Sequence, residues 1–247
     1  MTSFARLGAY LTDLFFPPRC VGCARAGFVF CPHCAQAVTP IAAPICAHCG
    51  RPQSQPVALC TACKTGGREA FSLLRVATVY SDPLRPAIHA LKYGGQPELA
   101  TPLARYLIAV AQQPPWPEIL AGVDGVVPVP LHSQRLVERG YNQSALLAGV
   151  FAERMGLVHR EGWLSRARQT RSQVGLSALE RQQNVADAFT ADSAVLGKRL
   201  LLIDDVFTTG ATLTACAQAL EEAGAAAIYG LVLSTPAPTQ GNALGDS

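Results

Sequence analysis

From about residue 70 to residue 235, strand-like stretches alternate with stretches that repeat apolar residues at helical spacing. Several of the strand-like runs are apolar throughout, which is typical of parallel strands covered on both faces. We therefore expect an α/β fold, a parallel sheet with helices on both faces. The expected strands are residues 73–80, 125–131, 199–206 and 226–233, and the expected helices are residues 84–92, 98–111, 144–155 and 213–223.

The two ends of the chain have a different pattern. Residues 3–16 space their large apolar side chains by three and four, which predicts an amphipathic helix. We expect this helix to pack on its own domain; the alternative is a membrane-surface or partner-binding helix, although its polar face is poor in Lys and Arg. The expected domains are an N-terminal module at residues 1–68, the α/β domain at residues 69–235 and a disordered tail at residues 236–247.

Residues 200–212 carry the clearest chemical pattern of the α/β domain. An apolar run ends in two adjacent carboxylates, Asp204 and Asp205, and a hydroxyl-rich loop around one glycine precedes the next helix. Parallel strands deliver such residues to the carboxyl edge of the sheet, where open α/β folds bind ligands. The loop offers backbone N–H groups and a helix N-terminus, which together form an anion site. Carboxylates for sugar hydroxyls beside amides for a phosphate predict a sugar-phosphate pocket.

Three further segments are expected near the same edge of the sheet. Residues 126–143 end a strand and continue into a loop with Arg135 and Arg139, which would suit a diphosphate; an ordinary surface loop is the alternative. Residues 164–184 form a polar, basic connection that would act as a closing lid, with a merely solvated loop as the alternative. Lys92 ends a helix before two glycines, and we assign it to structure rather than to ligand binding.

Eight of the nine cysteines fall into four C-x-x-C pairs. Such a spacing lets one tight turn present two sulfurs to a tetrahedral ion, and two pairs complete its coordination shell. The pattern predicts two structural zinc ions; the alternatives are buried thiols or a redox motif, which would not need four copies. We expect the first pair to join the second and the third to join the fourth, with crossed pairing left open. The predicted zinc ligands are Cys20, Cys23, Cys31, Cys34, Cys46, Cys49, Cys60 and Cys63, and Cys216 is expected to be a core thiol.

Composition and charge exclude only a few classes of binding partner. The net charge of +3 and the aromatic content of 7% do not indicate strong nucleic-acid binding, because no basic run is interleaved with aromatic residues. The sequence contains no P-loop, dinucleotide fingerprint or G-x-S-x-G elbow. It has no apolar run long enough to span a bilayer, and its N-terminus lacks the layout of a signal peptide. We expect a protein of the reducing cytoplasm, where cysteines are thiols or metal ligands.

Taken together, these motifs resemble the ComF family of competence proteins over nearly the whole chain. The resemblance rests on the paired C-x-x-C motifs, on segments 128–143 and 168–184, and on the motif Asp204-Asp-Val-Phe-Thr-Thr-Gly-Ala-Thr212. It implies a type I phosphoribosyltransferase-like domain that carries an N-terminal double zinc ribbon. It also implies that phosphoribosyl pyrophosphate (PRPP) binds together with Mg²⁺.

The resemblance further implies a role for each part of the pocket. Asp204 and Asp205 would hold the ribose hydroxyls. The 5-phosphate would be wrapped by Thr208, Thr209, Gly210, Ala211 and Thr212. The pyrophosphate and its Mg²⁺ would face Leu131, His132, Arg135 and Arg139. The lid, similar to the closing loop of amidophosphoribosyltransferases, would supply the catalytic residues Thr170, Gln173 and Arg181.

Three functions stay open at this level. The first is phosphoribosyl transfer to an unidentified nitrogen nucleophile with release of pyrophosphate, in DNA uptake and competence or in nucleotide metabolism. The second is a non-catalytic protein that senses PRPP and contacts single-stranded DNA through its zinc ribbons or through Arg166, Arg168 and Arg171. The third is an adaptor that docks protein partners of the competence machinery through residues 1–65. We favour a transferase-like PRPP binder, because every expected part of the pocket is present in the sequence.

Overall fold

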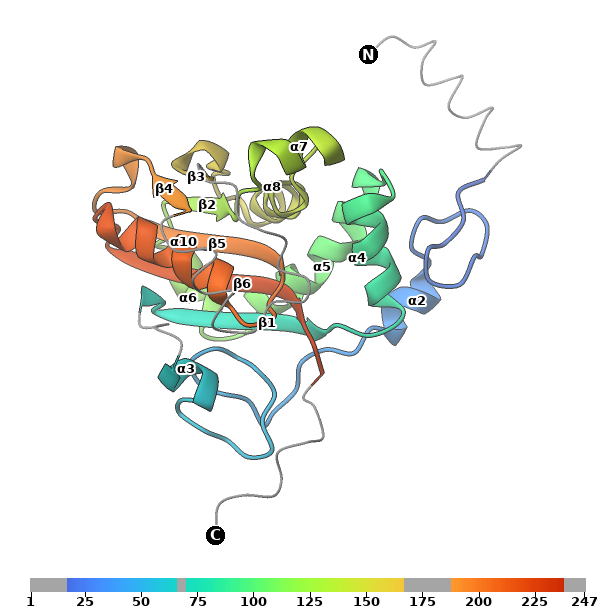
Figure 1. Ribbon diagram of the computed structural model, residues 1–247. Coiled ribbons are helices and arrows are strands. Elements are labelled where there is room, and N and C mark those ends of the chain that lie inside the picture. The colour runs from blue at the N-terminus through green and yellow to red at the C-terminus, as the bar shows by residue number, and fades with distance from the viewer. Residues whose placement is uncertain (1–16, 66–69, 167–187, 238–247) are drawn as a thin grey trace.

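A parallel β-sheet lies at the centre of the computed structural model, which describes residues 17–65, 70–166 and 188–237 (Figure 1). Within these ranges the sheet has four strands in the order β1-β6-β5-β2. The strands are β1 (Leu73–Val79), β2 (Gly125–Pro128), β5 (Arg199–Val206) and β6 (Ala227–Thr235). All three pairings are parallel, and the sheet confirms the fold class expected from the sequence.

Helices cover both faces of this sheet, as expected. One face packs against α5 and α8, which contact β1, β6, β2 and β5, while α10 contacts β6 from the other face. The main helices are α4 (Leu84–Tyr93), α5 (Ala100–Ala111), α8 (Gln143–Met155) and α10 (Ala211–Glu222). The shorter ones are α2 (Pro32–Ala37), α3 (Thr61–Thr65), α6 (Trp116–Leu120), α7 (Ser133–Arg139), η2 (Pro97–Leu99), η3 (Glu161–Trp163) and η4 (Ser193–Val195).

The continuous apolar run of β5 divides the core into two clusters. Because side chains alternate along a strand, Leu201 and Ile203 join the cluster on the α5 and α8 face. Leu200 and Leu202 join the cluster on the α10 face. All four are fully buried, which is why this strand shows no polar alternation in the sequence.

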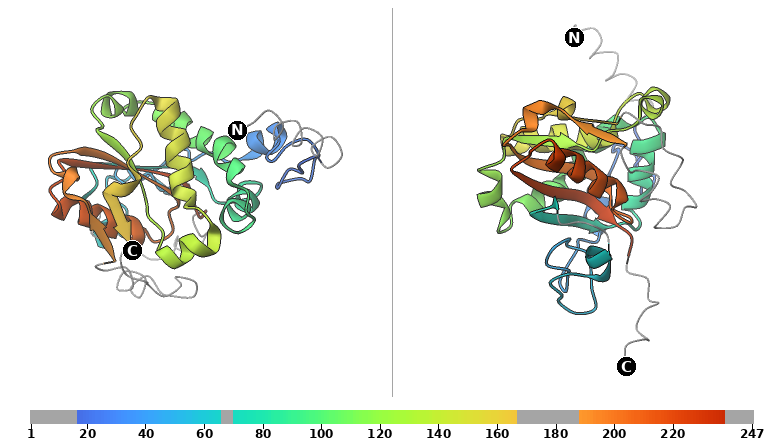
Figure 2. Two further views of the ribbon diagram at one scale, coloured as in Figure 1. Left: turned by 90° about the horizontal axis from the view of Figure 1, so that it is seen from above. Right: turned by 60° about the vertical axis from the view of Figure 1, so that its left-hand side comes forward.

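The cysteines of the two cysteine-rich segments belong to the two core clusters on opposite faces of the sheet. The first ribbon (residues 17–38) contributes cysteines to the cluster that contains α4 and α5, and the hydroxyl of Tyr106 on α5 donates to the carbonyl of Ala35 at 2.8 Å. The second ribbon (residues 45–65) contributes its cysteines to the α10 cluster. Figures 1 and 2 show the first ribbon beside α4 and the second ribbon next to β1.

Several expected elements need correction. Residues 133–139, expected as part of a loop, form helix α7, which begins with a cap from His132 to the N–H of Gln134 and ends at Gly140 in the left-handed region. The strand expected at residues 125–131 ends at Pro128. Helix α6 was not expected from the sequence, nor was the antiparallel pair of β3 (Leu164–Arg166) and β4 (Phe189–Ala191).

Three other expectations fall largely outside the described residues. They are the amphipathic helix at residues 3–16, most of the lid at residues 164–184 and most of the tail at residues 236–247. Among the residues that the structure does describe, no helix combines the length and the apolar character that a membrane crossing requires.

Candidate functional site

The site lies where β5 ends at the carboxyl edge of the sheet. Asp204 and Asp205 are 7% and 3% exposed, so both carboxyl groups are held inside the protein. Alternation along the strand sends them to opposite sides. Asp204 lies near Cys216 of α10 and also accepts a hydrogen bond from Ser144 of α8, whereas Asp205 contacts Lys92 of α4 and Gln143 of α8. The pair therefore connects the two faces of the sheet at one edge.

Asp204 is a buried acid with a strongly perturbed titration. Burial and the neighbouring charge of Asp205 raise its pKa to about 7, against the opposing effects of Lys92 and a hydrogen bond from Ser144. Ser144 Oγ donates to Asp204 Oδ1 at 2.9 Å. Asn142 caps α8 by accepting from the Ser144 N–H at 3.0 Å, which places the positive end of the helix dipole beside the acids.

Asp205 belongs to a chain of charged and polar contacts. Lys92 Nζ lies 2.5 Å from Asp205 Oδ2, and Gln143 Nε2 donates to Asp205 Oδ1 at 3.3 Å. Gln143 Oε1 in turn accepts from Arg139. Burial alone would lower the pKa of Lys92, but the attraction of Asp205 outweighs it and raises this pKa above its ordinary value. Lys92, assigned to structure by the sequence analysis, is thus part of the site.

Residues 207–212, the phosphate loop expected from the sequence, connect β5 to the first turn of α10 and surround a hollow of about 40 Å³. Gly210 adopts a φ of +87°, and α10 begins at Ala211, so the turn exposes backbone N–H groups at a helix N-terminus. The Thr209 hydroxyl accepts from the N–H of Ala211 at 3.3 Å, which tightens the turn. The hollow is lined by Asp204, Val206, Phe207, Thr208, Thr209, Gly210, Ala211, Thr212 and Leu213.

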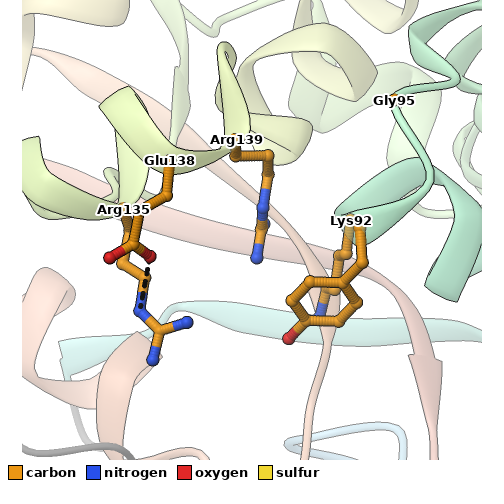
Figure 3. A pocket seen from close by; sticks show the side chains of 6 residues that line it. Lys92, Gly95, Arg135, Glu138 and Arg139 are labelled. Carbon is orange, nitrogen blue, oxygen red and sulfur yellow. Dashed lines mark ion pairs between the residues drawn. The ribbon is translucent and has the colours of Figure 1, made fainter.

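A second, basic hollow of about 270 Å³ lies between α4 and α7. Figure 3 shows Arg135, Glu138 and Arg139 on α7 opposite Lys92 on α4. The Arg139 guanidinium stacks on the ring of Tyr93, with 5.0 Å between Cζ and the centroid. Its lining holds three cations and one carboxylate, and Asp205 pairs with Lys92 from outside the lining, so the hollow keeps an excess of positive charge. It is lined by Lys92, Tyr93, Gly95, Arg135, Glu138 and Arg139.

The remaining predicted site residues either line neither hollow or lie outside the described residues. Leu131 and His132 lie between β2 and α7 and line neither hollow; His132 serves as the cap of α7. Arg166, at the end of β3, stacks on Phe189 at 5.3 Å, and burial lowers its pKa. The predicted catalytic residues Thr170, Gln173 and Arg181, together with Arg168 and Arg171, lie outside the described residues.

The eight paired cysteines form two separate tetrads, which confirms the expected pairing. Cys20, Cys23, Cys31 and Cys34 form one group, and Cys46, Cys49, Cys60 and Cys63 form the other, with ligand atoms within 4.8 Å of one another in each. The Sγ–Sγ distances include 3.6 Å for Cys23 to Cys31 and 3.7 Å for Cys49 to Cys60. A tetrahedral shell with Zn–S bonds of about 2.3 Å separates sulfurs by about 3.8 Å. Both tetrads therefore suit structural zinc, with no open coordination position.

Backbone hydrogen bonds favour a thiolate at one cysteine of each centre, whereas burial raises the pKa of Cys34, Cys49 and Cys63. Burial would raise the pKa of Cys20, but hydrogen bonds from the N–H groups of Cys31, Gly22 and Cys23 outweigh burial and lower this pKa to about 6. The same balance lowers the pKa of Cys46 to about 7. Cys216 behaves differently, because complete burial on α10 raises its pKa, as expected for a core thiol.

Comparison with known proteins identifies the chain. A double zinc ribbon family model matches residues 11–64. DNA utilization protein YhgH of Salmonella typhimurium is 35% identical over 198 residues, covering 80% of this chain and 86% of that protein. Competence protein ComFC of Bacillus subtilis is 30% identical, with 80% of each chain covered. The chain belongs to the ComF family. Competence protein F of Haemophilus influenzae is a further relative of this ComF-family chain, at 29% identity over 85% of this chain and 93% of that protein.

Two solved structures match parts of this ComF-family chain at low sequence identity. The match to glutamine PRPP amidotransferase from B. subtilis has 23% sequence identity and a TM-score of 0.36. It covers 57% of this chain and 26% of the amidotransferase chain. The match to a hypoxanthine phosphoribosyltransferase from Trypanosoma cruzi has 13% sequence identity and a TM-score of 0.34. It covers 63% of this chain and 74% of the transferase chain.

Proposed function

We propose that this ComF-family chain binds PRPP with Mg²⁺ and transfers its phosphoribosyl group to a nitrogen nucleophile, releasing pyrophosphate. The observation that carries the proposal is the acid pair between two anion-binding hollows. Asp204 lines the phosphate loop, and Asp205 contacts Lys92 of the basic hollow. A ligand with a phosphate at one end, a diphosphate at the other and hydroxyls between them matches this order of groups.

The two hollows differ in the way PRPP requires. The hollow of the phosphate loop is small and offers amides and hydroxyls, which suit the 5-phosphate. The basic hollow is larger and offers Lys92, Arg135 and Arg139, whose cationic groups suit the more highly charged pyrophosphate. The ribose hydroxyls would donate to the carboxylates of Asp204 and Asp205, and Lys92 would exchange part of its contact with Asp205 for the pyrophosphate.

Transfer then depends on charge stabilisation at the two ends of the breaking bond. The C1–O bond to pyrophosphate breaks, and its electron pair leaves with the pyrophosphate. Lys92, Arg135 and Arg139 would stabilise that growing negative charge in place. The carboxylates of Asp204 and Asp205 would stabilise the positive charge on the ribose. The nucleophile forms the new bond to C1 and gives its proton to solvent.

The lid and the metal complete the proposal. Thr170, Gln173 and Arg181 would close over bound PRPP and exclude water from the reacting carbon. Mg²⁺ would neutralise part of the pyrophosphate charge when bound. Carboxylates and phosphate oxygens are the ligands that this cation prefers, and Asp204 and Asp205 offer such oxygens beside the basic hollow.

Isothermal titration of the full chain with PRPP and Mg²⁺ tests the binding site. We expect Asp205→Asn to weaken binding by roughly tenfold or more, because an amide removes the charged acceptor and its pairing with Lys92. The matched control is Asp82→Asn, which also removes a carboxylate paired with a cation, Arg85, but at an exposed position. Equal affinities in the wild type and Asp205→Asn would remove the pocket assignment.

A pyrophosphate-release assay with bases, amines and single-stranded DNA as acceptors tests the transfer step. The names of the relatives, DNA utilization protein and competence protein, support a role in DNA uptake or use rather than in general metabolism. Release with at least one acceptor is the expected result. PRPP binding without release from any acceptor would contradict transfer.

A second function, non-catalytic PRPP sensing coupled to single-stranded DNA, is favoured by one observation. Tyr93 is 62% exposed beside Lys92, Arg135 and Arg139, so a base could stack on its ring while the cations contact the backbone. PRPP binding without release, together with DNA binding that PRPP alters, would favour this function over transfer.

A further inference from the structure

The second ribbon reaches the phosphate loop through one residue, Arg51. The backbone of Arg51 is part of the zinc centre: its carbonyl accepts from the N–H of Cys46 at 2.9 Å, and its N–H donates to the Cys49 sulfur. Its side chain contacts the phosphate loop, where Nη2 donates a hydrogen bond to the carbonyl of Thr208. One residue therefore links a structural zinc site to the backbone of the proposed 5-phosphate site.

The guanidinium of Arg51 rests on a rigid platform. Its Cζ lies 4.2 Å from the centroid of the Phe207 ring, and Phe207 is 1% exposed. The N–H of Phe207 donates to the carbonyl of Ser234 at 2.8 Å, and its carbonyl accepts from the Thr235 hydroxyl at 2.8 Å. Since both of these partners belong to β6, the platform is tied to the sheet, and the stacked guanidinium is held in one plane.

The other end of Arg51 is fixed as well. The turn at residues 46–51, called the zinc knuckle here, lies directly against β1. The N–H of Leu74 on β1 donates to the carbonyl of His48 in this turn at 3.2 Å. Gly50 adopts a φ of +67°, and a Cβ there would lie 3.0 Å from Arg75 Cδ and 3.1 Å from Arg75 Cα. Only glycine allows this close approach without displacement of β1. The knuckle, and the backbone of Arg51 with it, therefore has a defined position relative to the sheet.

A fixed Thr208 carbonyl has a consequence for the anion site. In a planar trans peptide, the carbonyl of one residue and the N–H of the next point in opposite directions. By holding the Thr208 carbonyl, Arg51 also fixes the direction of the Thr209 N–H, which lies in the same peptide plane and points the opposite way. We infer that Arg51 is a positioning residue, which orients the amides of the phosphate loop and makes PRPP affinity depend on the second zinc centre.

The first ribbon provides an internal comparison. Arg25 follows Cys23 by two residues, as Arg51 follows Cys49, and its carbonyl accepts from the N–H of Cys20 at 2.8 Å. Arg25 is exposed, however, and the first ribbon packs on the opposite face of the sheet. Two arginines in equivalent knuckle positions thus differ in whether they can reach the loop. The inference predicts that only the second ribbon affects ligand affinity.

Titration of full-length variants with PRPP and Mg²⁺ tests this inference, which rests on the proposed function. We expect Arg51→Ala to weaken PRPP binding by roughly tenfold, since it removes a charge-assisted hydrogen bond to the loop. Arg25→Ala should bind like the wild type. Arg51→Lys, which can donate to Thr208 without the stacked fork, should restore part of the affinity. Metal analysis should find two zinc ions in every variant.

A spectroscopic readout separates positioning from general damage. In amide NMR spectra recorded without ligand, Arg51→Ala should shift the Thr209 and Gly210 resonances, whereas Arg25→Ala should leave them unchanged. Wild-type affinity and unshifted loop amides in Arg51→Ala would overturn the inference while the proposed function stands. No PRPP binding by the wild type would overturn both. If Arg51→Ala failed to retain zinc, Arg51→Met would decide, because it keeps the length of the side chain but has no hydrogen-bond donor, and wild-type affinity there would contradict the inference.

Discussion

The carboxyl group of Asp204 lies in surroundings that oppose its ionisation. Burial and the charge of Asp205 raise its pKa to about 7, from an ordinary value near 3.8. Between these two values the folded protein binds a proton that the unfolded chain does not. The resulting stability is fully present below the ordinary pKa and is lost as the pH rises through about 7. The acid that we propose to bind the ribose is therefore a source of instability at neutral pH.

Asp204→Asn should remove this pH dependence. From pH 5 to pH 8 the free energy of unfolding of the wild type should fall by roughly 2–3 kcal/mol more than that of the variant, at about 1.36 kcal/mol per pKa unit. Urea unfolding at the two pH values measures this difference. Asp82→Asn, at an exposed ion pair, should keep the wild-type slope. If the free energy of unfolding changed with pH equally in the wild type and in Asp204→Asn, the raised pKa of Asp204 would be contradicted.

The residue scale also shows what sequence patterns reveal and what they miss. Asp204 and Asp205 could be predicted as site residues because an apolar strand ends in them, and strand ends are local features. Lys92 and Arg51 could not, because their roles depend on packing between segments far apart in sequence: Lys92 pairs with an acid 113 residues later, and Arg51 reaches a carbonyl 157 residues later. The repeat of an arginine two residues after a C-x-x-C pair was visible, but it gave no reason to distinguish Arg51 from Arg25.

At the scale of the element, β6 depends on a glycine at the centre of the sheet. A Cβ at Gly230 would lie 2.4 Å from Leu74 Cδ1 and 3.0 Å from Phe71 Cε1, both buried on the face that carries the second ribbon. Gly230→Ala should destabilise the protein by about 1–3 kcal/mol through overpacking. This corresponds to a fall in Tm of several degrees for a chain of this size. Thermal unfolding followed by circular dichroism measures it.

Gly162→Ala provides the control, because a Cβ at Gly162 would meet no atom within 4 Å. Its Tm should stay within about a degree of the wild type. A Tm for Gly230→Ala equal to that of Gly162→Ala would show that Leu74 and Phe71 can move aside without cost.

Elements with strong periodicity were predicted well, and short ones were not. The strand at residues 199–206 was expected with the bounds it has, because eight mostly apolar residues leave little choice. Helix α7 was expected as a loop because none of its residues is buried, so no apolar stripe marks it. It is stabilised instead by its caps and by an ion pair, Arg135 with Glu138 at 3.8 Å. The helical conformation of α7 matters for the proposed function, because it fixes the positions of the two arginines that line the basic hollow.

At the scale of the whole molecule, the ribbons belong to different cores. The sulfurs of the first tetrad pack with α4 and α5, and those of the second pack with β1 and α10, so the sheet separates the two centres. The C-x-x-C spacing predicted the number of centres and their pairing. It carried no information on their placement, which depends on the apolar surface that each face of the sheet leaves for a ribbon.

This separation predicts two zinc ions that are lost independently. Native mass spectrometry should find two ions in the wild type and one in each of Cys31→Ser and Cys60→Ser, because each variant breaks one tetrad and leaves the other intact on the opposite face. Cys216→Ser should retain both ions, since Cys216 belongs to neither tetrad. Loss of both ions from a single-tetrad variant would mean that the centres are coupled through the sheet. Retention of one ion in each case would leave the second ribbon free to act on the phosphate loop without the first.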